Sequence, residues 1–201
     1  MSIVDETIIR LFFEQHGFFV RKLAPPTTTQ PKRGEAPGVA LQVRNDAAEA
    51  VAGKPGFLVF ASELRYLPEA EITAKPWPET RFTPDVLRSS ARLFRFLEKT
   101  VLPRARRKRP AVPNTPGQKP GQPPPQILVV PALPTAEPYR GKSEALFREQ
   151  GVDGLISFRS MLLEVINSID ARNSAGGCET LETLQLLKKY DLTGSAQLDL
   201  F

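Results

Sequence analysis

The chain of 201 residues contains one cysteine, one histidine and no long apolar run. The lone Cys178 excludes an internal disulfide and a zinc site built from several cysteines, a composition typical of proteins kept in a reducing compartment. No stretch approaches the roughly 18 consecutive apolar residues that a transmembrane helix requires, and the first residues include acids where a secretory signal would carry bases. We therefore expect a cytoplasmic protein with no membrane partner.

The sequence also lacks several common signatures of catalysis. It contains no Gly-rich loop of the phosphate-binding type, no Cys/His spacing suited to a metal and no nucleophile elbow. The only histidine, His16, is a candidate general base, but a lone histidine at the end of a helix more often binds the last carbonyl groups of that helix. These absences exclude the most recognisable nucleotide-binding and hydrolase patterns.

Hydrophobic residues make up 41% of the chain, which is enough for one ordinary folded core. Helical periodicity and capping residues predict helices, which are expected over residues 3–16, 84–101, 137–150, 161–171 and 179–190. Apolar runs bounded by turn-forming residues predict strands, which are expected over residues 18–23, 39–43, 57–60, 70–75, 127–131 and 152–158. The predicted fold class is α/β, with a mixed central sheet flanked by helices.

Both halves of the chain are expected to contribute to that sheet. The first four strands are predicted to form an antiparallel meander, and the strand, helix, strand order after residue 127 implies a right-handed parallel crossover. The intervening segment is rich in Pro, Gly, Gln and basic residues and is predicted to be disordered. The predicted divisions are 1–102 and 127–171 as the two parts of the α/β domain, 103–126 as the insertion, 172–192 as the C-terminal helix and 193–201 as a flexible tail.

Positive charge is concentrated in one part of the chain. Residues 81–109 contain ten Lys or Arg and two acids, a charge of +8, which leaves −3 for the rest of a chain whose total is +5. Four of these bases recur at spacings of four, three and four and would share one helical face; they are Arg88, Arg92, Arg95 and Lys99. Such a face either binds phosphates without reading base sequence or is simply solvated.

Further bases extend this predicted surface on both sides. The candidate DNA-binding residues outside the four on the helix are Arg81, Arg104, Arg106 and Arg107. The alternative interpretation is that the run after residue 103 keeps a linker in solution and that Glu98 and solvent balance the helix. On the first interpretation, DNA is the expected partner.

The element order resembles the PD-(D/E)XK superfamily of restriction-endonuclease-like nucleases over most of residues 3–170. Glu14 followed by Gly17-Phe18-Phe19-Val20 is similar to the opening of the resolvase-type members, and residues 151–157 are similar to their last core strand. The resemblance implies a restriction-endonuclease-like fold in which acids and a lysine on neighbouring strands hold Mg²⁺ and orient a water for attack on a phosphodiester.

The resemblance also implies candidate catalytic residues. Lys75 matches the lysine of the motif, although Thr73 stands where the motif has an acid. Glu71 lies on the same face of the predicted strand as Lys75 and is the substitute candidate. The remaining acids considered are Asp46 or Glu49 after the preceding strand, and Glu14. The alternative is that Glu71 and Lys75 form the ordinary exposed face of an edge strand.

The last five residues form the most specific pattern in the chain. Gln197, Leu198, Asp199, Leu200 and Phe201 are similar at every position to the peptide by which bacterial polymerases and repair proteins bind the sliding clamp. A flexible tether precedes them, and their apolar side chains suit a groove on a partner. The alternative is that these side chains fold back onto the domain.

These patterns predict a protein of DNA replication or repair that docks on the sliding clamp and binds DNA. If active, it would hydrolyse phosphodiesters with Mg²⁺. The alternatives are a catalytically inactive adaptor that recruits a partner to the clamp, and a structural protein whose tail belongs to its own core.

Overall fold

The computed structural model describes residues 3–23, 38–48, 55–97, 124–170, 178–190 and 192–193. Predictions that concern the 103–123 part of the insertion, Glu49, Lys99, Arg104, Arg106, Arg107 and the pentapeptide at 197–201 lie outside these residues. No helix of the described ranges combines the length and apolarity needed to cross a lipid bilayer.

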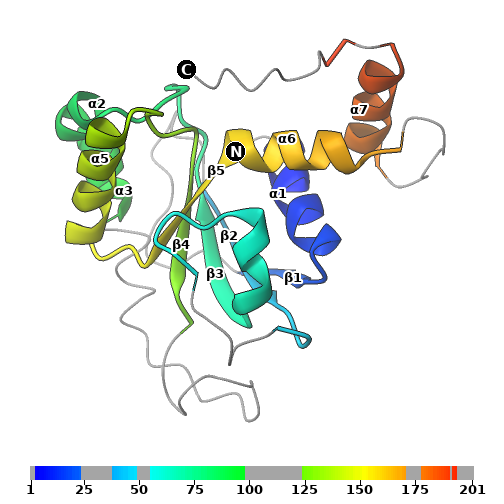
Figure 1. Ribbon diagram of the computed structural model, residues 1–201, viewed down its shortest axis with the longest axis horizontal. Helices are drawn as coiled ribbons and strands as arrows, with labels where there is room; N and C mark the ends of the chain where they lie inside the picture. Colours follow the sequence, from blue (N-terminus) through cyan, green and yellow to red (C-terminus); the bar gives the residue numbers. More distant parts are fainter. Residues whose placement is uncertain are drawn as a thin grey trace.

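A five-stranded mixed sheet forms the centre of the molecule (Figure 1). Its strands are β1 (Phe19–Lys22), β2 (Val39–Arg44), β3 (Glu69–Ala74), β4 (Gln126–Val130) and β5 (Gly154–Ser157), in the spatial order 1-2-3-4-5. The first three are antiparallel, and β3, β4 and β5 are parallel. The predicted mixed α/β class and the single sheet drawn from both halves of the chain are confirmed.

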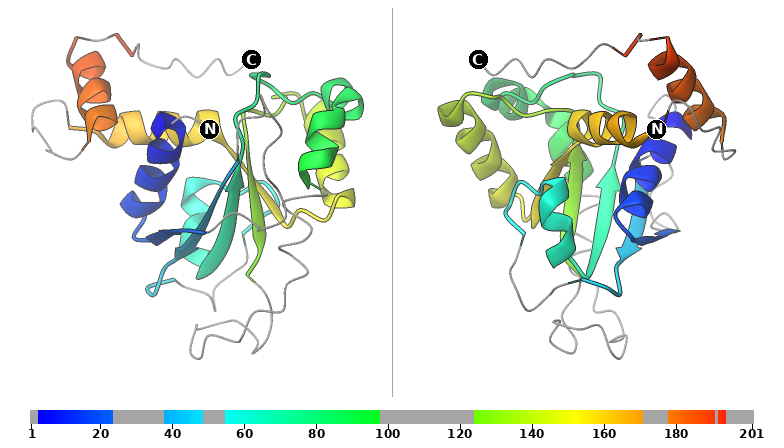
Figure 2. Two further views of the ribbon diagram at one scale, coloured as in Figure 1. Left: turned by 180° about the vertical axis from the view of Figure 1, so that it is seen from behind. Right: turned by 45° about the vertical axis from the view of Figure 1, so that its right-hand side comes forward.

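Helices cover both faces of the sheet (Figure 2). One face carries α1 (Ile3–Gln15), α6 (Phe158–Ser168) and the short 3₁₀ helix η1 (Ala61–Tyr66), while α7 (Glu179–Lys189) packs against α1 and α6. The other face carries α2 (Pro84–Ser89), α3 (Ala91–Phe96) and α5 (Glu137–Glu149). Because alternate residues of a strand point to opposite faces, each layer has its own apolar cluster.

The first cluster joins α1, η1 and α6 to the inner strands, with Phe13, Leu41 and Ile72 fully buried. The predicted end of α1 is confirmed: Gly17 adopts a φ of +79°, and the Phe18 amide returns to the Phe13 carbonyl at 3.1 Å. A residue with a β-carbon would be strained at this φ, which is why glycine ends the helix here.

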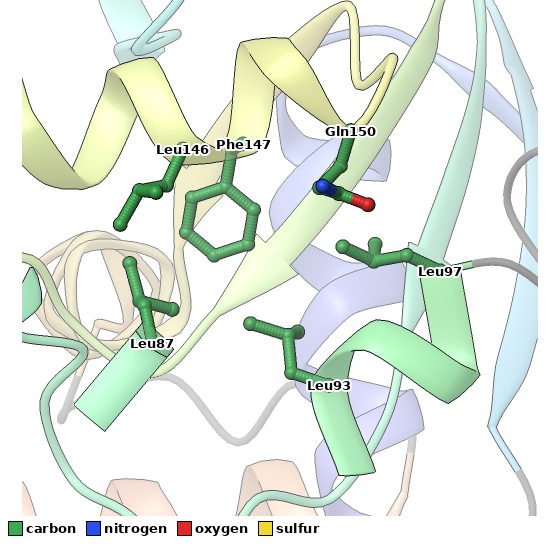
Figure 3. Close-up of a pocket in the computed structure, with 6 residues that line it drawn as sticks. All are labelled: Leu87, Leu93, Leu97, Leu146, Phe147 and Gln150. Atoms are coloured by element: carbon green, nitrogen blue, oxygen red, sulfur yellow. The ribbon is translucent and has the colours of Figure 1, made fainter. Parts of the chain in front are cut away.

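The second cluster joins α2, α3 and α5 to β4 and β5. Figure 3 shows three leucines of the 87–97 segment facing Leu146 and Phe147 of α5, with Gln150 at the rim. The space between these side chains is too small for a water molecule, so this crevice is a packed helix contact and not a ligand site.

The predicted strand at 57–60 is not part of the meander. Leu58 forms only an isolated parallel bridge with Leu155, at the β5 edge of the sheet. The Glu63 carboxylate accepts hydrogen bonds from the backbone amides of Gly56 and Phe60 at 3.0 Å each. These hydrogen bonds favour the start of η1 directly after this segment. A short apolar run cannot indicate which sheet edge it will meet.

The predicted helix over 84–101 is also wrong, because the chain breaks at Ser90. Ser90 has φ −83° and ψ 80° and ends α2, and its hydroxyl accepts the Leu93 amide at 3.3 Å as a cap for α3. Serine competes with the helical backbone in this way. Arg88 and Arg95 therefore lie on separate short helices, and the predicted continuous basic face across the break is not formed.

Candidate polar site on the central sheet

The α2/α3/α5 face of the sheet is apolar at one end and polar at the other. Leu128 pairs with Leu155 across β4 and β5, Val130 ends β4, and all three belong to the second cluster. Toward the amino ends of β3 and β4, this face carries polar residues instead of apolar ones. They form one row across four strands, because Arg21 pairs with Gln42, Gln42 with Glu71 and Glu71 with Gln126. We call this the polar row.

Several side chains on the polar half of this face are buried. Glu71, Thr73 and Gln126 are each 2% exposed, and Glu69 is 6% exposed. Burying a carboxylate or an amide is unfavourable unless its hydrogen bonds are replaced. A group of four such residues in the central strands is therefore a candidate functional site or an internal hydrogen-bond network.

Part of the group is a hydrogen-bonded chain of side chains. Arg21 Nη2 donates to Gln42 Oε1 at 2.5 Å, and Gln42 Nε2 donates to Glu69 Oε1 at 2.5 Å. A positive charge on the edge strand is thereby linked through an amide to a carboxylate in the sheet interior. Hydrogen bonds with one charged partner are the stronger kind, which helps to hold Glu69 in place.

The other part of the group has unsatisfied polar atoms. The hydroxyl of Thr73 and both amide atoms of Gln126 are buried, and none has a hydrogen-bond partner among the residues that the structure describes. The backbone of Gln126 is well held, because its amide donates to Asp153 Oδ2 at 2.8 Å and its carbonyl accepts the Asp153 amide at 3.0 Å. The backbone of Gln126 is thus held by Asp153, while its side-chain amide makes no hydrogen bond to a described residue.

Comparison with family models, curated proteins and solved structures gave no match.

Glu71 and Lys75 share one face of β3 and its continuation, as predicted. Four residues of strand separate their Cα atoms by about 13 Å. The Lys75 ammonium lies 5.6 Å from the ring centroid of Trp77 and 5.2 Å from that of Phe96, at the apolar end of the face. Glu71 is also buried on a central strand, so the alternative of an exposed edge strand does not hold for it.

The other predicted acids do not join Glu71. Asp46 follows the end of β2 at which Arg44 pairs with Glu69, whereas Lys75 follows the other end of the β2–β3 pair. The Asp46 carboxylate accepts a hydrogen bond from Arg44 Nε at 2.6 Å. Glu14 is exposed on α1, where Arg10 pairs with it at 3.2 Å, and α1 covers the opposite face of the sheet. The predicted grouping of Glu71 and Lys75 with Asp46 or Glu14 is therefore not formed.

His16 binds a carbonyl group at the end of its own helix, which is the predicted alternative to a role as general base. Its Nδ1 lies 2.7 Å from the Phe12 carbonyl oxygen, so this nitrogen carries the proton and donates to the last turn of α1.

A metal site at the polar row would depend on few acids. Within the described ranges, no three side chains of His, Cys, Asp or Glu are grouped so as to hold an ion. The oxygen atoms present on this half of the face are those of Glu69, Glu71, Thr73 and Gln126, which are hard donors of the kind that Mg²⁺ prefers. The donor types are compatible with Mg²⁺, although the described side chains are not grouped as an ion site.

Three of the predicted DNA-binding residues can be placed. Arg81, Arg88 and Arg95 are all exposed and lie in the segment that follows β3. Arg88 Nη1 stands 4.0 Å from Asp85 Oδ1, a contact too open and exposed to neutralise it strongly. The backbone of Arg92 lies in α3.

Sequence reasoning missed Gln42, Glu69 and Gln126. A signal existed for each: Gln42 interrupts an otherwise apolar strand, Glu69 continues the alternation of Glu71 and Thr73, and Gln126 directly precedes the apolar run of β4. Gln126 had been assigned to the insertion and not to the strand. Only the strand register puts these residues together.

Proposed function

We propose that this chain is a DNA-associated protein of the replication or repair machinery, attached to the sliding clamp through Gln197–Phe201. The observation that carries the proposal is the pentapeptide itself, which agrees with the clamp-binding pattern at every position. The exposed arginines after β3 support DNA contact, because exposed guanidinium groups bind phosphates without base specificity.

A restriction-endonuclease-like fold is part of this proposal. It is supported by the element order of one helix, three antiparallel strands, a helical segment and a parallel strand. It is also supported by the two acids on β3, the strand that carries the acid and lysine in the family that the sequence resembles.

The clamp interaction is expected to be modest in affinity. A short peptide loses conformational freedom when it binds, and this cost offsets part of the gain from burying Leu200 and Phe201. A transient attachment suits a protein that must share the clamp with other partners.

Calorimetry with a purified bacterial sliding clamp tests this attachment. The full chain should bind, and the chain lacking residues 197–201 should not. A chain with Leu200→Ala and Phe201→Ala should lose most of the binding heat, whereas Ser195→Ala, in the tether, should bind like the unchanged protein. Absence of binding by the full chain would reject the proposal.

A second candidate function is favoured by the buried acids of β3, namely Mg²⁺-dependent phosphodiester hydrolysis. The ion would supply charge stabilisation, and Glu71 would help to hold it. A water oxygen would form the new bond to phosphorus while the bond to the leaving oxygen breaks and a proton passes to that oxygen. Lys75, on the same face of the strand, would contribute positive charge.

Cleavage of labelled DNA with and without Mg²⁺ separates this candidate from the inactive adaptor. An enzyme should cut in a Mg²⁺-dependent manner, and Glu71→Gln should abolish cutting while Glu149→Gln, an exposed change on α5, leaves it intact. Clamp and DNA binding without any cutting by the unchanged protein would instead identify an adaptor.

A further inference from the structure

A second polar site lies on the opposite face of the sheet from the polar row. It is an open pocket of about 510 Å³ bounded by the end of α1, the turn after β2, η1 and α6. These elements surround one side of the sheet in Figure 1. The pocket is lined by His16, Asn45, Ala47, Ala61, Ser62, Leu64, Arg65 and Glu164.

An arginine and a glutamate line this pocket and do not form an ion pair with each other. Arg65 comes from η1 and Glu164 from α6, and both are exposed. No ion pair within 4.0 Å joins them to each other, nor either of them to a further residue of the described part of the chain. A hollow that separates a cation from an anion is complementary to a ligand that carries both charges itself.

The Arg65 side chain is held in part by its contact with Tyr66. The Arg65 guanidinium carbon lies 4.8 Å from the centroid of the Tyr66 ring. Stacking of this kind leaves the N–H edge of the guanidinium for a carboxylate, which it can bind through two parallel hydrogen bonds.

His16 adds a third polar group in a fixed orientation. Its Nδ1 is engaged by the Phe12 carbonyl at 2.7 Å, and its ring lies 4.8 Å from the Phe12 ring. Nε2 is the remaining ring nitrogen and can bind a polar ligand group as acceptor, or as donor when the ring is protonated. Asn45 is similarly fixed, because its Oδ1 accepts the Ala47 amide at 2.9 Å.

The rest of the lining mixes small apolar and polar groups. Ala47 and Ala61 contribute methyl groups and Ser62 a hydroxyl, while Leu64 is almost fully buried at 1% exposed. The two methyl groups offer contact for a short aliphatic group between the charged ends.

We propose that this pocket binds a small zwitterion of amino-acid to dipeptide size, with its carboxylate on Arg65 and its ammonium group on Glu164. This inference does not depend on clamp or DNA binding, and it assigns the chain's only histidine to a ligand site. The short aliphatic side chain of the ligand would lie on Ala47 and Ala61.

The single histidine makes the test direct, because its Hε1 proton gives one NMR signal that can be assigned to this pocket. L-alanyl-L-alanine, titrated into the full-length protein, should shift that signal in a saturable way. N-acetyl-L-alanine, which lacks the ammonium group, and L-alanine amide, which lacks the carboxylate, should each bind at least about tenfold more weakly, a difference of about 1.4 kcal/mol.

Variants of the two charged residues complete the test. Arg65→Gln and Glu164→Gln should each weaken binding of L-alanyl-L-alanine at least about tenfold. Lys142→Gln and Glu149→Gln, exposed changes on α5 at the other face of the sheet, should leave the titration unaltered. A signal that does not shift, or that shifts equally with the singly charged analogues or in the Arg65 and Glu164 variants, would overturn the proposal.

Discussion

At the scale of single residues, the polar half of the sheet face depends on a few hydrogen bonds made away from water. Glu69 is 6% exposed, and its carboxylate accepts a hydrogen bond from Gln42, whose own oxygen accepts one from Arg21. Side-chain networks of this kind are fixed only while every member keeps its partner.

Replacement of Gln42 by Met should therefore destabilise the protein. The change keeps the volume of the side chain but removes the donor to Glu69, and an acceptor left without its partner in the interior costs about 1–3 kcal/mol. The free energy of unfolding in urea measures this loss.

Two further variants check the cause. Gln15→Met makes the same change at an exposed position of α1 and should alter stability by less than about 0.5 kcal/mol. The pair Gln42→Met and Glu69→Met should recover part of the loss, because no carboxylate is then left without its donor. Equal losses for Gln42→Met and Gln15→Met would contradict the network.

At the scale of elements, α7 is attached to the domain by one lysine as well as by apolar contacts. Lys188 Nζ donates to three carbonyls at the end of α6, those of Ile166 and Asn167 at 2.9 Å and that of Ile169 at 2.7 Å. The ammonium group thus satisfies the carbonyl groups that a helix leaves open at its carboxyl end, where positive charge is also favoured.

Lys188→Met should lower the free energy of unfolding by about 1–2 kcal/mol, since three accepting carbonyls lose a charged donor. Its neighbour Lys189 is exposed and provides a matched control, so Lys189→Met should have an effect near zero. Thermal unfolding followed by circular dichroism compares the two, and an equal effect of both changes would show that α7 is held by its leucines alone.

The elements differ in how well the sequence predicted them. The ends of α1 and α7 were predicted to within a residue or two, because capping and periodicity are local properties. The 57–60 strand and the helix through Ser90 failed for the opposite reason. Hydrogen bonds accepted by the Glu63 carboxylate and by the Ser90 hydroxyl decide these segments, and apolar spacing carries no information about either.

At the scale of the whole molecule, the break at Ser90 changes how DNA contact should be tested. With Arg88 and Arg95 on different helices, a contact would involve several separate arginines and not one helical stripe. Each phosphate contact contributes about 0.9 to the dependence of log K on log salt concentration.

Joint replacement of Arg81, Arg88 and Arg95 by Gln should weaken DNA binding and lower the salt slope by about 2 to 3. Fluorescence anisotropy of a labelled duplex at several salt concentrations measures both quantities. Joint replacement of Arg10, Lys142 and Arg159 by Gln changes the net charge equally at exposed positions elsewhere. If the two triple variants lose affinity to the same extent, the binding reflects total charge and the arginines after β3 are not the contact.

The sequence by itself determined much of the local pattern of this protein: most of the helices, the five strands of the mixed sheet, the concentration of positive charge and the clamp-like pentapeptide. Each follows from residues close together in the chain, through periodicity, capping or a short motif. The tertiary structure alone decided which side chains meet. Gln42, Glu71 and Gln126 are far apart in sequence and form one row because strand pairing sets their register. Asp46 does not join Glu71 because it follows the last residue of β2, and Glu14 does not because α1 covers the opposite face of the sheet.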